Sequence, residues 1–165
     1  MSELPALTRR EAQPYVAIAT AVTMEGFDVV EPLTDEVFAW MEQHGVVRAG
    51  WPFVRIVTSD MSAEQDIEVG VPVESASSTD HRFLVGAVPA GTYATLIYPA
   101  KEDHDHYQAN VDIQAWAEKE HLEWDLDRSS GVDVWVGRFE FIRPDLSKDD
   151  AMVFELIYKV IDPAD

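Results

Sequence analysis

The chain has 165 residues, enough for one domain that buries a single core without covalent cross-links. It contains no cysteine, so disulfide bonds and thiolate metal sites are excluded. Its 31 acidic residues against 12 basic ones give a formal net charge of −19, and autonomous binding to nucleic acid is therefore not expected.

The first half of the chain is expected to form a strand, a helix and two further strands after a polar arm. Apolar residues at three- and four-residue spacing indicate a helix of about four turns, with Pro32 in its first turn and Gly45 as its C-terminal stop. Pro72 predicts that the last strand of this half lies at a sheet edge or carries a bulge. The expected elements are the arm at residues 1–13, a strand at 15–23, the helix at 30–44, and strands at 52–58 and 66–74.

The second half repeats this order and ends in an antiparallel hairpin. Its first strand is too long for an ordinary strand and is expected to bend at residues 89–91 (PAG). The expected elements are this strand at residues 82–98, a helix at 104–121, a loop at 125–131, and hairpin strands at 132–142 and 151–161 joined by residues 144–150. The sequence Ala-Trp-x-Glu occurs at residues 39–42 and 115–118, at corresponding places in the two helices. We therefore predict one domain over residues 1–165, built from repeated units at about 13–75 and 81–162.

Glu140 is the candidate charged residue of a binding site. It lies between Phe139 and Phe141 in an apolar strand. Because moving a lone charge out of water is costly, an inward-facing carboxylate must be paired, protonated or available to an incoming cation. The alternative is that Glu140 pairs with Arg138 or Arg143 at the rim of the sheet. The aromatic neighbours favour the ligand site.

Three segments resemble the motifs of a known family. Residues 66–73 (DIEVGVPV) and 88–94 (VPAGTYA) resemble the paired signature of GyrI-like domains, the effector-binding module of AraC-type and MerR-type multidrug regulators. Residues 50–53 (GWPF) are similar to the family's Gly-x-Pro-Phe motif. The resemblance implies an α+β fold of two tandem strand-helix-strand-strand units with pseudo-two-fold symmetry around a ligand groove. It also implies that Glu140, by its position, contacts cationic aromatic ligands.

The sequence departs from the family pattern at three places. The tyrosine of the family's Glu-x-Tyr pattern is Ile142 here, its Asp-Pro is replaced by residues 143–145 (RPD), and its Gly-Pro-Tyr by residues 98–100 (YPA). Ligand contacts are therefore expected to differ there. No helix-turn-helix segment precedes the domain, so the resemblance implies a stand-alone ligand-binding module.

Aromatic residues are expected to line the groove around the charge of Glu140. Trp40 and Trp116 follow the helix stripes and are expected in the core instead. The candidate ligand-binding residues are Glu140, Trp51, Phe53, Tyr98, Tyr107, Phe139, Phe154 and Tyr158. No cofactor is expected. Residues 102–106 (EDHDH) are interpreted as a solvated helix start, because a metal site needs three or four ligands of defined geometry.

These residues favour a protein that binds lipophilic, aromatic and cationic small molecules in the groove. One alternative that the resemblance implies is a hydrolase of cyclopropane-bearing genotoxic compounds, with Glu140 as general base or acid and Tyr98, Tyr107 or Tyr158 supplying a hydroxyl. A second alternative, also implied by the resemblance, is a gyrase-inhibitor-like module that binds another protein through its acidic surface.

The sequence also predicts where the protein resides and which partners it lacks. No apolar run reaches the roughly 18–20 residues of a membrane span, and residues 1–10 lack the apolar core of a signal peptide. We therefore expect a cytoplasmic protein whose partners are small molecules, without nucleic acid or membrane.

Overall fold

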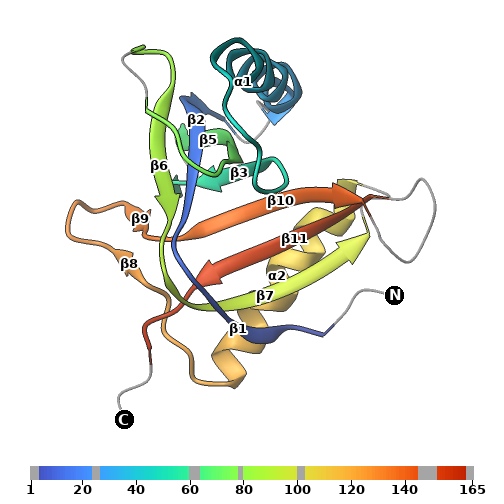
Figure 1. Cartoon of the computed structure of the whole chain (residues 1–165). Coiled ribbons are helices and arrows are strands. Elements are labelled where there is room, and N and C mark those ends of the chain that lie inside the picture. The colour runs from blue at the N-terminus through green and yellow to red at the C-terminus, as the bar shows by residue number, and fades with distance from the viewer. Residues whose placement is uncertain are drawn as a thin grey trace.

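The core of the molecule is an eight-stranded antiparallel sheet that curls into a half-barrel, with two helices on its outer face (Figure 1). The computed structural model describes residues 4–23, 27–59, 64–77, 80–99, 103–144 and 152–162, without the side chains of residues 27 and 103–106. In chain order the elements are β1 (Ala6–Arg10), β2 (Gln13–Val22), η1 (Phe27–Val29), α1 (Val30–His44), β3 (Phe53–Ile56), β4 (Thr58–Ser59), β5 (Gln65–Pro72), β6 (Leu84–Val88), β7 (Gly91–Pro99), α2 (Asp103–Lys119), β8 (Leu126–Asp127), β9 (Asp133–Trp135), β10 (Arg138–Pro144) and β11 (Met152–Lys159).

Apart from the edge strands β1 and β6, the two halves of the chain occupy opposite halves of the large sheet. Its strand order is β1-β7-β11-β10-β3-β5-β2-β6, and a small second sheet has the order β4-β9-β8. Strands β3, β5 and β2 of the first half lie on one side of the β10–β3 contact, and β10, β11 and β7 lie on the other. The structure thus confirms the predicted α+β fold and the strand-helix-strand-strand order. That the halves are repeated units related by pseudo-two-fold symmetry stays a prediction.

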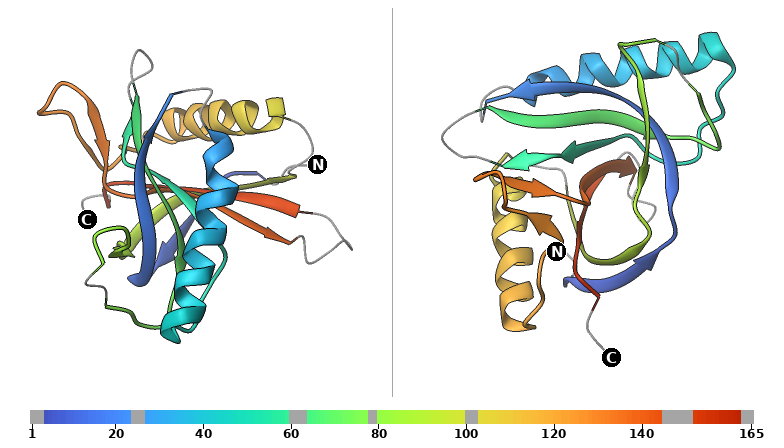
Figure 2. Two further views of the ribbon diagram at one scale, coloured as in Figure 1. Left: turned by 90° about the horizontal axis from the view of Figure 1, so that it is seen from above. Right: turned by 90° about the vertical axis from the view of Figure 1, so that its left-hand side faces the viewer.

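Two bent strands produce the curl. Only residues 11–12 separate β1 from β2, and only residues 89–90 separate β6 from β7, where the sequence predicted a bend. β1 pairs with β7 at one edge of the large sheet, and β2 pairs with β6 at the opposite edge. Each bent strand therefore forms one edge of the sheet and continues as the strand next to the opposite edge. Figure 2 shows that the sheet curves around an inner face that the helices do not cover.

Both helices pack against the outer face. α1 ends where Gly45 adopts a left-handed φ of 65°, a conformation that glycine reaches without a steric cost. It buries Val37, Trp40 and Met41 against β2 and β5, which confirms Trp40 as a core residue. α2 packs on β7 through its buried Ala109, Ile113 and Ala117, and Trp116 is partly buried against the same core. Within the described residues, no helix is long and apolar enough to cross a membrane.

Aromatic rings fill the inner face of the sheet. The rings of Tyr15 and Phe53 meet edge to face with centroids 4.8 Å apart, and those of Phe53 and Phe139 do so at 5.3 Å. Such pairs contribute roughly 0.5–1.5 kcal/mol beyond their buried area. The buried inner-face cluster consists of Tyr15, Ala17, Phe53, Val88, Tyr93, Phe139, Phe141 and Ile157.

The buried hydroxyl of Tyr93 makes the stability of the fold sensitive to alkaline pH. Burial raises the pKa of Tyr93 to about 12, and the hydroxyl donates to the carbonyl oxygen of Pro89 at 2.7 Å. Because the folded pKa exceeds the unfolded value of about 10, the stabilisation is complete below pH 10 and is lost as the pH rises toward 12. We expect Tyr93→Phe to remove up to about 1.4 kcal/mol per pH unit from the alkaline fall in the free energy of unfolding. Urea unfolding at pH 9, 10 and 11 measures this slope. Equal slopes for both proteins would contradict it.

The structure corrects the expected arm and the expected last edge strand. Residues 6–10 are not an arm but the edge strand β1, which pairs with β7 through its backbone. The local pattern misses it because most of its side chains are exposed. Pro72 is the last residue of β5, which lies between β3 and β2 and is not an edge strand. The strand end tolerates proline because fewer ladder hydrogen bonds depend on it.

The expected strand at residues 132–142 is two strands in two sheets. β9 pairs with β4 and β8, whereas β10 pairs with β11 and β3. The chain turns at Gly137, where a Cβ atom would lie 2.9 Å from the Tyr93 hydroxyl. The β10–β11 hairpin itself is confirmed. Residues 145–150 of its expected connector, and residue 151 of the expected second strand, lie outside the described part of the chain.

Candidate ligand-binding site

Glu140 lies near the middle of the large sheet, on the outer face. Its neighbours in register are Val54 on β3 and Leu156 on β11, which both belong to the core beneath the helices. Phe139 and Phe141 point to the opposite, inner face. Only 8% of Glu140 is exposed. The fold therefore places a buried carboxylate on the outer face, between the part of the sheet that α1 covers and the part that α2 covers.

The hydroxyl of Tyr158 links this region to α2. Tyr158 is fully buried, and its hydroxyl donates a hydrogen bond to Oδ1 of Asn110 on α2. Burial raises the pKa of Tyr158 and the Glu140 carboxylate raises it further, whereas the Arg138 guanidinium lowers it. The side chain of Gln114 on α2 also lowers this pKa. The phenol therefore keeps its proton and holds α2 to the sheet beside Glu140.

Arg138 places a cation over two aromatic rings in the same region. Its guanidinium carbon lies 4.8 Å from the centroid of the Trp135 ring and 4.6 Å from that of Tyr158. Nη2 of Arg138 donates to Oδ1 of Asn110 at 3.4 Å. We call Glu140, Arg138, Tyr158, Trp135 and Asn110 the Glu140 cluster. It combines a buried carboxylate with rings that already hold a cation.

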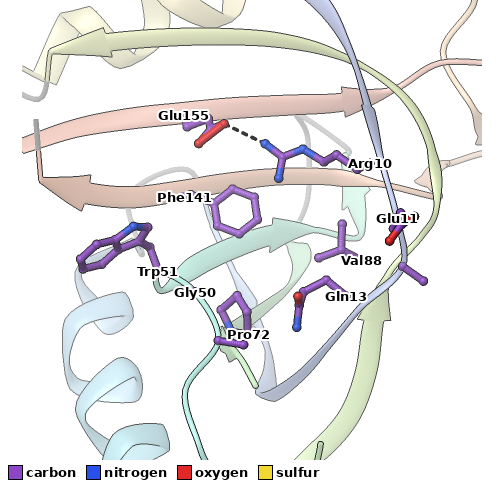
Figure 3. Close-up of a pocket in the computed structure, with 11 residues that line it drawn as sticks. Arg10, Glu11, Gln13, Gly50, Trp51, Pro72, Val88, Phe141 and Glu155 are labelled. Atoms are coloured by element: carbon purple, nitrogen blue, oxygen red, sulfur yellow. Dashed lines mark hydrogen bonds and ion pairs between the residues drawn. The ribbon is translucent and has the colours of Figure 1, made fainter. Parts of the chain in front are cut away.

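The inner face carries a second candidate region, a groove of about 480 Å³ at one mouth of the half-barrel. Figure 3 shows the ring of Phe141 at its centre, Trp51 on one side and Val88 on the other. Arg10 crosses it and donates from Nη2 to Oε2 of Glu155 at 2.7 Å, drawn as the dashed line. We call this region the Arg10 groove.

The structure divides the eight predicted site residues between the two faces. Four lie on the outer face, namely Glu140, Tyr98, Phe154 and Tyr158, with Tyr98 and Phe154 stacked at a centroid distance of 5.3 Å. Phe53 and Phe139 belong to the inner-face cluster, and Trp51 lines the Arg10 groove. Tyr107 lies on α2 and is 70% exposed. The eight residues therefore do not converge on one groove.

Sequence reasoning missed several residues that the structure brings together. Trp135, Trp124 and Asn110 join Tyr158 in space from segments far apart in the chain, with the Trp124 ring centroid 5.0 Å from that of Tyr158. The sequence suggests Arg138 only as a rim partner of Glu140, although the two residues are two apart and so share a strand face. The predicted helix start at residues 102–106 lies outside the described side chains.

Solved structures establish what the fold resembles. The crystal structure of the EcmrR C-terminal domain aligns with 96% of this chain and 98% of that domain, with a TM-score of 0.74 and 14% identity. The chain has the fold of the EcmrR C-terminal domain. This EcmrR-like fold is the one that the GyrI-like motifs predicted, whereas family membership itself stays a prediction. No family model and no curated protein matches the sequence.

Two further solved structures share the EcmrR-like fold at a lower TM-score of 0.58. SAV2435 bound to tetraphenylphosphonium is 11% identical, and the match covers 97% of this chain and 95% of that one. A hydrolase from Listeria innocua is 12% identical, with 96% and 92% covered. The EcmrR chain in a complex with DNA is longer, and this chain spans 57% of it. At these identities the likeness concerns the fold.

Proposed function

We propose that this chain is a small-molecule-binding domain whose Glu140 cluster takes lipophilic, aromatic cations. Its GyrI-like motifs favour small-molecule binding. SAV2435, which shares the fold, was solved with tetraphenylphosphonium, a lipophilic cation with four aromatic rings. The proposal transfers that class of ligand to this chain.

The geometry of Arg138 is the observation that carries the proposal. A guanidinium rests over the rings of Trp135 and Tyr158 at 4.8 and 4.6 Å, beside the buried carboxylate of Glu140. A cation over an aromatic face gains roughly 0.5–2 kcal/mol, with the larger values where water is excluded. Arg138 is only partly buried, so an incoming cation can displace it from the solvent side. The cluster is therefore already arranged to hold a cation.

The overall charge acts in the same direction. A net charge of −19 raises the local concentration of cations near the protein. Screening limits this attraction to about 10 Å at 0.1 M salt, so it assists the encounter and does not choose the site. The choice between a cation and a neutral compound must come from the buried carboxylate and the rings.

Isothermal titration with a cation and a neutral compound of similar shape tests the proposal. Tetraphenylphosphonium is expected to saturate one site with a Kd on the order of micromolar. Triphenylphosphine oxide, which carries aromatic rings without the charge, is expected to bind at least about tenfold more weakly. Equal affinities, or no saturation by the cation, would count against the Glu140 cluster as a cation site.

Replacing Arg138 is expected to strengthen cation binding. Arg138→Gln removes the cation that occupies the two rings and leaves Glu140 with less neighbouring positive charge, so the affinity for tetraphenylphosphonium should rise about three- to tenfold. Arg128→Gln makes the same charge change at a side chain that is 72% exposed, and serves as the control in the same titration. An increase of equal size in both variants would show a general charge effect and not the release of the rings.

One observation favours the hydrolase alternative. The protonated hydroxyl of Tyr158 lies in the electrostatic reach of Glu140, so a carboxylate and a phenol are available as base and acid. A hydrolase from Listeria innocua shares the fold. A product that has gained water from a cyclopropane-bearing compound, detected by mass spectrometry and abolished in Glu140→Gln, would establish this activity. The protein-binding alternative stays a prediction.

A further inference from the structure

Arginines gather at the Arg10 groove although the protein as a whole is acidic. Arg10 lines the groove, and Arg143 donates from Nε to the same carboxylate, Oε1 of Glu155, at 3.3 Å. Arg48 lies 4.6 Å from the ring centroid of Trp51, which forms one wall. These are three of only 12 basic residues in the chain. This mouth of the half-barrel is therefore richer in arginine than the composition of the chain would suggest.

Three guanidinium groups, those of Arg10, Arg48 and Arg143, lie at the groove against two carboxylates, those of Glu155 and Glu11. Arg10 and Arg143 both pair with Glu155. Among the described residues, the buried Nε of Arg10 has no hydrogen-bond acceptor. Because Arg10 lines the groove, an anion bound there would lie against its guanidinium group and offset the excess positive charge. Because guanidinium groups bind carboxylates through paired, charge-assisted hydrogen bonds, a carboxylate is the favoured anion.

The walls of the groove suit an aromatic body. The Phe141 ring forms its centre, and the guanidinium of Arg10 lies 5.5 Å from the centroid of that ring. Trp51 is 41% exposed, which leaves ring surface for a ligand to cover. Val88 and Pro72 add apolar surface. The volume of about 480 Å³ lies within the range of roughly 300–1,000 Å³ that small-molecule sites occupy.

We propose that the Arg10 groove binds small aromatic carboxylates. Arg10 binds the carboxylate of the ligand, Arg143 adds positive charge nearby, and Trp51 and Phe141 contact the aromatic ring. The net negative charge of the protein does not prevent this binding. At 0.1 M salt, screening limits the electrostatic repulsion from distant carboxylates to a range of about 10 Å, whereas Arg10 would contact the ligand directly. The groove is on the inner face and the Glu140 cluster is on the outer face, so this proposal does not rest on the proposed cation site.

Isothermal titration with three naphthalene compounds tests the site at moderate salt. 2-Naphthoate is expected to saturate one site, while neutral 2-naphthylmethanol binds at least tenfold more weakly. Arg10→Gln is expected to weaken 2-naphthoate at least tenfold. Arg9→Gln is the matched control, since Arg9 is the adjacent residue, carries the same charge and has a side chain that is 72% exposed. The affinity of Arg9→Gln for 2-naphthoate should stay within twofold of that of the unchanged protein. 2-Naphthylmethylammonium should not compete with 2-naphthoate.

Two further variants separate the roles of ring and charge. Trp51→Ala is expected to weaken 2-naphthoate at least threefold without a change in thermal stability, because Trp51 is largely outside the core. Glu155→Gln removes the competing carboxylate and is expected to strengthen 2-naphthoate. Glu140→Gln should leave the affinity for 2-naphthoate unchanged, so a failure of the Arg10 groove proposal is distinguishable from a failure of the cation-site proposal. No saturation by 2-naphthoate, or equal losses in Arg9→Gln and Arg10→Gln, would overturn the proposal.

Discussion

Glu140→Gln is expected to bind tetraphenylphosphonium at least about tenfold more weakly than the unchanged protein. Gln keeps the size and shape of the side chain and removes only its charge, and one charge contact in a site closed to water is worth about 1.4 kcal/mol or more. Glu140 is 8% exposed, so solvent screens such a contact little. Titration calorimetry on both proteins measures the ratio of the two dissociation constants.

Three controls distinguish a lost cation contact from a damaged fold. Glu118→Gln makes the same charge change at an exposed position of α2 and should leave the affinity within twofold. Triphenylphosphine oxide should bind Glu140→Gln and the unchanged protein alike, because it carries no charge for Glu140 to contact. Thermal unfolding should show that Glu140→Gln still folds. If the cation binds Glu140→Gln as tightly as the unchanged protein, Glu140 does not contribute to recognition of the ligand's positive charge.

Gly70→Ala is expected to lower the free energy of unfolding by about 1–3 kcal/mol, a typical cost of overpacking a core. A Cβ atom on Gly70 would lie 2.5 Å from the carbonyl oxygen of Val16 and 2.9 Å from the Phe53 ring. The first is a backbone atom of the neighbouring strand β2, which is paired on both sides and has little room to move. For a domain of this size the melting temperature should fall by roughly 2–12 °C.

A change of similar size at an exposed strand position is the control for Gly70→Ala. Ala21 lies on β2 with an exposed side chain, so Ala21→Ser adds one atom where nothing confines it. We expect its melting temperature to change by less than about 2 °C, in line with surface substitutions. A Gly70→Ala variant as stable as Ala21→Ser would show that the sheet widens there without cost.

Local patterns in the sequence predicted most of the fold. The helix at residues 30–44 followed from apolar spacing with Pro32 and Gly45 at its ends, and it agrees with α1 at both ends. The bend at residues 89–91 followed from Pro and Gly within a long apolar run. These features depend on residues that are near one another in the chain. β1 could not be found in this way, because its pairing with β7 joins residues more than 80 positions apart and leaves little apolar pattern.

The site was harder to predict than the fold. Alternation implied that Glu140 faces away from Phe139 and Phe141, but not which face lies under the helices. That assignment depends on where α1 and α2 pack, and therefore on the whole sheet. The Arg10 groove depends on the curl as well, since Arg10 and Glu155 meet across 145 positions of sequence. No local pattern in the sequence marks these two residues, because they become neighbours only when the sheet curls.

The bent strands tie the two halves of the molecule together in a way that concerns its folding. β1 belongs to the first half of the chain yet borders β7 of the second, and β6 of the second half borders β2 of the first. Each half thus lends its outermost strand to the other, as domain-swapped partners do. A fragment of either half would leave the border strand of the other half uncovered, with free backbone groups that invite aggregation. The exchange obliges both halves to reach the native state together.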